Sequence, residues 1–189
     1  MSVVQSKLAF GAALVAVMVA SFVAVQLVLP GPSASSTTEA DPSIFASHDF
    51  GRGAEGERAI LRNGWLDART DCRWSGGRAE LALPKVFTPA QAVEMRVNSR
   101  GLVSASRPSQ SVNFIVNGSL VGKLQFKSEA NGRVQTFKIS PAVYNAAKGP
   151  LRIAFVEPTP ASFADVGSGS DTRKRSICLD RLSMSLAAS

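Results

Sequence analysis

The sequence predicts an all-β domain, a jelly-roll-like two-sheet β-sandwich, preceded by one N-terminal transmembrane helix. Three observations predict it: an uncharged apolar run over residues 8–29, apolar residues at every second position beyond residue 60, and Asn-Gly pairs between such runs. The chain has 189 residues, 21 Lys and Arg against 14 Asp and Glu, and two Cys. This size and composition leave room for one basic domain and exclude a multidomain enzyme, a polytopic transporter and a disulfide-dense toxin.

The apolar run is long enough for one membrane crossing. As a helix, residues 8–29 would span about 33 Å. The alternative is a cleaved signal peptide, whose apolar core is typically only ~7–15 residues long. Because Lys7 precedes the run, the positive-inside rule places residues 1–7 in the cytoplasm. We therefore expect a single-pass protein of the bacterial inner membrane.

A Pro/Ser/Thr-rich stretch follows the predicted anchor. Residues 30–43 have few apolar side chains and begin with Pro-Gly-Pro, so we predict a short flexible linker. Residues 44–189 then form the periplasmic β-sandwich domain.

Small residues recur along the predicted anchor. Such residues let a second helix approach closely, so this stripe is a candidate docking face for an inner-membrane partner. The alternative is an anchor that is merely rich in alanine. The stripe consists of Ala12, Ala16, Ala20 and Ala24.

Within the domain, alternation predicts the strands. Residues 79–83, 93–97 and 151–155 alternate between apolar and other side chains, as half-buried strands do. Residues 111–139 predict a three-stranded meander, because Asn-Gly pairs at 117–118 and 131–132 favour type I′ turns.

The last strand and one helix complete the prediction. Residues 177–186 form a strand that is expected to place Cys178, Leu182, Met184 and Leu186 on one face. Residues 141–147 predict the only helix of the domain, with Pro141 at its first position.

The two cysteines are expected to pair. Cys72 lies near the first strands of the domain and Cys178 on its last strand, and the predicted location is oxidising. Two free core thiols are the alternative. No Cys-x-x-Cys or Cys/His spacing supports a zinc or redox site, and no cofactor is predicted.

Catalytic motifs are not evident. Residues 51–56 match Gly-x-Gly-x-x-Gly without the strand and helix that a dinucleotide site needs, and His48 is the only histidine. Asp67, Asp71 and Asp180 are interspersed with arginines, so we expect salt bridges, with a calcium site as the alternative. We predict that the protein is not an enzyme.

The most distinctive segment contains both tryptophans. Gly64-Trp65 is followed by Trp74-Ser75-Gly76-Gly77 and the alternating strand 79–83, and a later hairpin contains Val116-Asn117-Gly118. Over residues 60–186 this pattern resembles uncharacterised bacterial envelope β-sandwich domains attached to or encoded beside glycosyltransferases and polysaccharide-assembly proteins. The resemblance implies a jelly-roll domain with an accessory, saccharide-related role.

Candidate ligand-binding residues follow from this segment. Trp65 and Trp74 can stack on sugar rings, while Arg73 and Asn117 can bond sugar hydroxyls. The alternative is that the tryptophans pack in the core, above all Trp74, which flanks the strand 79–83.

The densest basic run is Arg173-Lys174-Arg175. Such a patch attracts anionic lipid headgroups, acidic polysaccharide or an acidic protein surface. A solvated loop is the alternative, because residues 166–172 are rich in Gly and Ser. Nucleic acid is not an expected partner, since aromatic and basic residues are not interleaved.

Two functions fit these patterns. The first is a membrane-anchored carbohydrate-binding accessory module in envelope polysaccharide synthesis or export. The second is a non-catalytic structural subunit of an inner-membrane complex, docked through the transmembrane helix and the basic domain surface.

Overall fold

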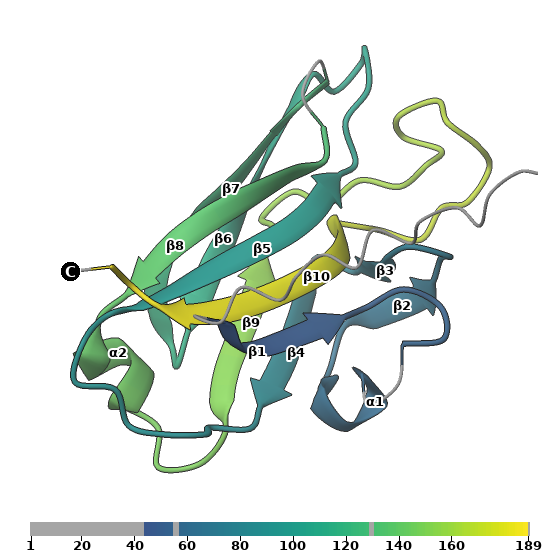
Figure 1. Ribbon diagram of the computed structural model, residues 1–189. Helices are drawn as coiled ribbons and strands as arrows, with labels where there is room; N and C mark the ends of the chain where they lie inside the picture. Colours follow the sequence, from purple (N-terminus) through teal and green to yellow (C-terminus); the bar gives the residue numbers. More distant parts are fainter. Residues whose placement is uncertain (1–43, 55–56, 129–130, 189) are drawn as a thin grey trace, which may run out of the picture. The chain divides into compact units, whose positions relative to one another are not determined.

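The computed structural model describes residues 44–54, 57–128 and 131–188. They form two antiparallel sheets packed face to face (Figure 1). In this part of the chain no helix has the length and hydropathy of a membrane span. The predicted N-terminus 1–7, anchor 8–29 and linker 30–43 lie outside the described residues, so those assignments stay predictions.

The first sheet contains six strands in the order β2-β3-β10-β5-β8, with β1 also paired to β10. Its long central strands, β5 and β10, pair over most of their length. The bounds are β1 Ile44–Asp49, β2 Trp65–Ala68, β3 Arg73–Ser75, β5 Val93–Gly101, β8 Arg133–Ile139 and β10 Ile177–Leu186.

The second sheet contains four strands in the order β4-β9-β6-β7, which are β4 Arg78–Leu83, β9 Leu151–Val156, β6 Ser109–Val116 and β7 Ser119–Lys127. The predicted all-β two-sheet fold is therefore confirmed. Two short helices lie outside the sheets, α1 Glu57–Ile60 and α2 Pro141–Asn145. The side chain of Ser140 caps α2 by accepting a hydrogen bond from the Val143 amide at 3.3 Å.

The main core lies between the two sheets. Alternate residues of each strand point inward, so the inner faces carry Val, Leu, Ile, Met and Phe side chains that are almost completely buried. Phe114 of β6 and Phe155 of β9 lie with ring centroids 5.6 Å apart in the middle of the second sheet. On the opposite sheet Met95 of β5 pairs with Met184 of β10.

The predicted meander over residues 111–139 is correct for its first two strands only. β6 and β7 form the expected hairpin, and Asn117 and Gly118 both have positive φ, 48° and 84°, as a type I′ turn requires. β8, however, pairs with β5 in the first sheet and not with β7. The chain crosses from one sheet to the other here, which a local turn signal does not reveal.

The predicted face of the last strand is also wrong in part. A register shift between Leu179 and Arg181 marks a β-bulge, which exchanges the two faces of β10. As a result Leu182 and Met184 enter the main core, whereas Cys178 faces a second, smaller cluster. Leu186 keeps the predicted face with Leu182 and Met184 but is exposed at the end of the strand.

The predicted disulfide between Cys72 and Cys178 is present, with the two Cα atoms 5.5 Å apart. It joins the start of β3 to β10, where Cys178 is the register partner of Trp74. Together with Leu102, Ala161 and Val166, these residues form the second buried cluster.

Candidate functional site

Both tryptophans pack against the domain. Trp65 is half-buried, stacks on Phe50 with ring centroids 6.0 Å apart, and donates its indole hydrogen to the Glu80 carbonyl at 2.7 Å. Trp74 is only 8% exposed and meets Phe163 edge to face at 5.5 Å. Their rings contribute to packing, and a role in stacking on a sugar stays a prediction.

The two polar candidates have internal partners as well. The Arg73 guanidinium forms an ion pair with the buried Glu57 and donates to the Leu66 carbonyl at 3.0 Å. The Asn117 amide donates to the carbonyls of Val143 and Tyr144 at 2.9 and 3.1 Å, so it ties the β6–β7 turn to α2.

The structure does not bring these four candidates together. Trp74 lines a cavity beside the disulfide, Arg73 lies beside α1, and Asn117 lies beside α2. Figure 1 shows α2 and the loop between β9 and β10, which carries Phe163, at opposite ends of the sandwich. If one ligand site exists, it cannot consist of all four residues.

The predicted basic patch is not a surface of three free cations. Arg175 is 2% exposed, lies over the Trp74 and Phe163 rings at 5.7 and 4.8 Å, and forms an ion pair with Asp171. Arg173 forms ion pairs with Asp67 and Asp171, and Lys174 pairs with Asp165 at 2.6 Å. The carboxylates that neutralise this run come from its own loop and from β2, which a run of basic letters does not show.

The aspartates considered for calcium are engaged as well. Asp67 and Asp71 pair with Arg173 and Arg100, and Asp180 accepts a hydrogen bond from the Asn98 amide at 2.7 Å. The hydrogen bond from Arg173 lowers the pKa of Asp67, whereas burial raises the pKa of Asp180. Over the described ranges, no three His, Cys, Asp or Glu side chains gather where they would hold a metal ion.

A groove of about 550 Å³ crosses the outer face of the second sheet. We call it the outer-face groove. It is lined by Arg62, Asn63, Arg78, Glu80, Leu81, Ala82, Ile115, Gly118, Pro150, Arg152, Ile153 and Ala154. The residues come from β4, β9, β6 and the segments beside them, so only the folded sheet assembles this surface.

Sheet register explains the shape of the groove. Glu80, Ala154 and Ile115 are partners on three adjacent strands and form a row across the sheet. Arg78 lies two residues before Glu80 on β4, and Arg152 lies two residues before Ala154 on β9. Because the two strands are antiparallel, the two arginines are on opposite sides of this row. The rows that contain Arg78 and Arg152 are therefore separated by four residues, or about 13 Å. The short side chains between these two arginines, such as Ala154, form the floor of the groove.

Two small residues of the floor are almost completely buried. Ala82 and Ala154 point to the outer face, yet they are 7% and 8% exposed. Arg62, from the segment after α1, closes the β4 side, held by hydrogen bonds from its guanidinium to the Ala59 and Leu61 carbonyls at 2.9 and 2.8 Å. Sequence reasoning missed these residues. The alternation within each strand indicated which residues point outward, but the sequence did not indicate that β4, β9 and β6 lie side by side.

A second cavity of about 470 Å³ lies beside the disulfide and is lined by Trp74, Phe163 and Arg100, among others. Two of its polar side chains have partners within the domain. Arg100 pairs with Asp71, and the Asn131 amide exchanges two hydrogen bonds with the Gly101 backbone at 2.7 and 2.9 Å. Of the two, the outer-face groove is the larger, and its Arg152 has no carboxylate partner among the described residues, so we take it as the candidate site.

Comparison with known proteins shows similarity in fold. No protein-family model matches the sequence, and no curated protein matches it. A family GH115 4-O-methyl-alpha-glucuronidase with specificity for decorated arabinogalactans aligns with a TM-score of 0.51 at 7% identity, over 79% of this chain. This chain spans only 18% of that enzyme.

Two carbohydrate-binding modules align with lower scores. One is a CBM36 module in complex with calcium and xylotriose, 12% identical over 74% of this chain and 99% of the module, with a TM-score of 0.42. The other is a CBM36-1 domain of a xylanase from the hindgut metagenome of Trinervitermes trinervoides, 9% identical over 76% and 98%, with a TM-score of 0.44. At these identities the likeness concerns the fold alone, and the glucuronidase alignment supports the β-sandwich assigned above.

Proposed function

We propose that this chain is a membrane-anchored, non-catalytic carbohydrate-binding module that serves envelope polysaccharide synthesis or export. The observation that carries the proposal is the outer-face groove, with its low apolar floor and its guanidinium and amide groups along the sides. A groove across a sheet face suits an extended polymer, whereas an enclosed cavity suits a small molecule.

The chemistry of the groove matches that of a sugar chain. Ile115 offers an apolar surface to the C–H face of a pyranose ring, and the small side chain of Ala154 beside it leaves room for that ring. Arg62, Asn63 and Arg152 provide planar groups with several N–H donors, which can bond ring hydroxyls on either side. Apolar contact with a few oriented polar groups is the usual composition of a ligand site.

The carboxylate content of the groove supports binding without catalysis. Glycoside hydrolysis generally needs two carboxyl groups flanking the scissile bond. Among the described residues that line the groove, Glu80 is the only carboxylate, and it forms an ion pair with Arg78 at 2.7 Å. An acid–base pair is therefore not available in the groove.

The setting of the module follows from the sequence. The apolar run 8–29 and Lys7 predict a single-pass anchor with the domain in the periplasm. The linker 30–43 would hold the groove near the membrane surface, where a glycosyltransferase or another inner-membrane assembly protein would be its partner.

Filling the groove tests the proposal. Ala154→Phe places a large ring on the floor and should abolish binding of the full-length chain, in mild detergent, to a panel of neutral and acidic bacterial polysaccharides. Thr136→Phe is the matched control, because Thr136 is an exposed residue of β8 on the other sheet. Thermal unfolding of both variants confirms that they are folded.

The outcomes separate the two functions considered from the sequence. Binding that only Ala154→Phe removes supports the carbohydrate-binding function. No binding to any polysaccharide overturns it and favours the structural subunit, whose partner would be sought by purifying the full-length chain with what accompanies it.

A further inference from the structure

The distribution of unpaired charge across the surface is uneven. Within the described ranges, every carboxylate except Asp180 forms an ion pair with an Arg or Lys, so the excess cations stand without a carboxylate partner. The Arg173-Lys174-Arg175 run is neutralised in this way. The free positive charge therefore lies elsewhere.

Several of these unpaired cations lie on the outer face of the second sheet. In that part of the chain, Arg62 and Arg152 at the groove have no carboxylate within ion-pair distance, and neither have Lys123 and Lys127 on β7. Lys123 and Lys127 point outward, because the intervening Leu124 and Phe126 are buried in the core.

Register places Lys123 in the same row as Arg78, beyond the residues that line the groove. Arg78, Val156, Asn113 and Lys123 are successive partners across β4, β9, β6 and β7. Three strand spacings separate the ends of this row, about 14 Å. A polymer lying across the strands would thus run from the guanidinium groups at β4 to the ammonium group at β7, with Arg152 on its other side.

We infer that the outer-face groove takes an anionic polysaccharide, whose carboxylates are bound by Arg62 and Arg152 in the groove and by Lys123 on β7 beyond it. Guanidinium groups bind carboxylates through two parallel hydrogen bonds, which fixes the orientation of each acidic sugar. Among the described residues that line the groove, Glu80 is the one acidic side chain, and its ion pair with Arg78 reduces its repulsion of such a ligand. This inference rests on the proposed function and names its substrate class.

Matched polymers separate the contribution of charge from that of the sugar. The full-length chain in mild detergent is tested against polygalacturonate and alginate, against the same polymers after reduction of their carboxylates to alcohols, and against polyglutamate. We expect binding to both polyuronates, at least tenfold weaker binding to the reduced forms, and weaker binding to polyglutamate, which has charge without sugar rings.

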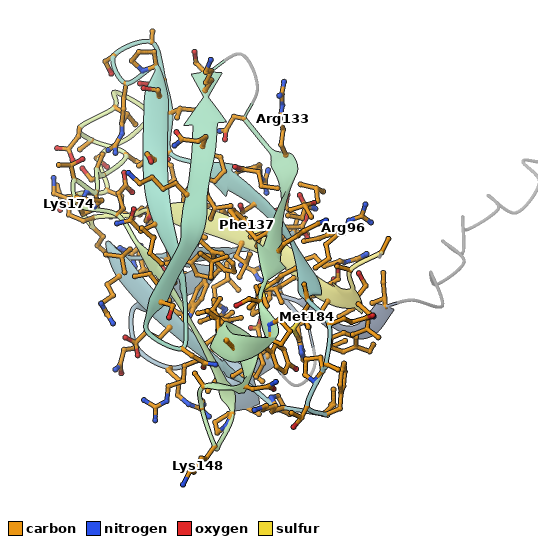
Figure 2. All side chains as sticks on the ribbon, turned by 90° about the vertical axis from the view of Figure 1, so that its left-hand side faces the viewer. Arg96, Arg133, Phe137, Lys148, Lys174 and Met184 are labelled. Carbon is orange, nitrogen blue, oxygen red and sulfur yellow. A yellow bond between two sulfur atoms is a disulfide. The ribbon has the colours of Figure 1, made fainter. Side chains whose placement is uncertain are left out.

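Charge-removing variants locate the site. Arg152→Gln should weaken polyuronate binding about five- to tenfold, as expected for one partly exposed charge-assisted contact, and Arg62→Gln together with Arg152→Gln should weaken it further. Arg133→Gln is the control of equal charge change. Arg133 is exposed on β8 of the first sheet and points away from the domain in Figure 2.

Each outcome decides a different point. Equal binding of acidic and reduced polymers, unaffected by Arg152→Gln, overturns the anionic class while leaving carbohydrate binding intact. Equal weakening by Arg133→Gln, or polyglutamate binding as tight as polyuronate binding, shows general attraction to polyanions and overturns the assignment. No binding of either polyuronate at low salt overturns it, and if neutral polymers also fail to bind, the proposed function fails with it.

Discussion

Replacing Cys72 and Cys178 with serine should destabilise the domain more than any substitution on its surface. The disulfide closes a loop with a sequence separation of 106 residues. In the chain-entropy relation, a crosslink over that length stabilises the folded state by about 4.8 kcal/mol at 25 °C, and measured values are often lower. We therefore expect the serine variant to lose about 3–5 kcal/mol of unfolding free energy. This is a large part of the about 5–15 kcal/mol by which small domains are stable.

Urea unfolding of the full-length chain in mild detergent, followed by tryptophan fluorescence, measures this difference. The serine variant should unfold at a lower urea concentration and be indifferent to reductant. The wild-type chain should approach it when reductant is added. A difference in unfolding free energy below about 1 kcal/mol, or titratable thiols in the native wild-type chain, would refute the reasoning.

Three other predictions concern two buried charged side chains and a turn. Arg175→Ala should lower the unfolding free energy by about 2–4 kcal/mol, because it leaves a gap beside Trp74 and removes a buried cation. The control Arg173→Ala changes an exposed ion pair and should lower it by less than about 1 kcal/mol in the same urea titration. Burial raises the pKa of the Glu157 carboxyl, so the folded state binds its proton more tightly than the unfolded state does. Protonation of Glu157 therefore stabilises the folded state at low pH, and this stabilisation is lost as the pH rises through the folded-state pKa. The unfolding free energy of the wild type relative to Glu157→Gln should therefore increase as the pH falls from 7 towards 4.5, and a constant difference would contradict this. Asn117→Ala removes the hydrogen bonds that join the β6–β7 turn to α2 and should cost about 1–3 kcal/mol, with a midpoint shift below 0.5 M urea arguing against a structural role.

Local signals were sufficient for the strands from β4 onward and for the crosslink, whereas β1, β2 and β3 were not predicted. Alternation over residues 79–83, 93–97 and 151–155 reports a face buried against a core, which depends on each strand alone. The type I′ turn at Asn117 is likewise a property of two adjacent residues. The pairing of Cys72 with Cys178 followed from their number and position.

Features that depend on distant partners were not predictable. The sequence around β8 resembles the third strand of a meander, yet its hydrogen bonds go to β5, because the core is buried only when the chain changes sheets. The bulge between Leu179 and Arg181 shifts the alternation of β10 without a Gly or Pro to mark it.

The candidate site illustrates the same limit. Aromatic and basic residues attract attention in a sequence, but Trp74 and Arg175 meet each other in the interior. The groove instead depends on two alanines, Ala82 and Ala154, whose small side chains lie low between longer neighbours. Strand order, which brings β4 beside β9, had to be known first.

The pairing of β1 with β10 has a mechanical consequence. Any tension applied through the residues before Ile44 reaches the β1–β10 ladder first, because β1 begins the described domain and pairs with β10 alone. β10 is also held by β5, by β3 and by the disulfide, so we expect β1 to peel away under load before β10 moves. The strands that form the floor of the groove belong to the other sheet, so β1 can detach before the load reaches them.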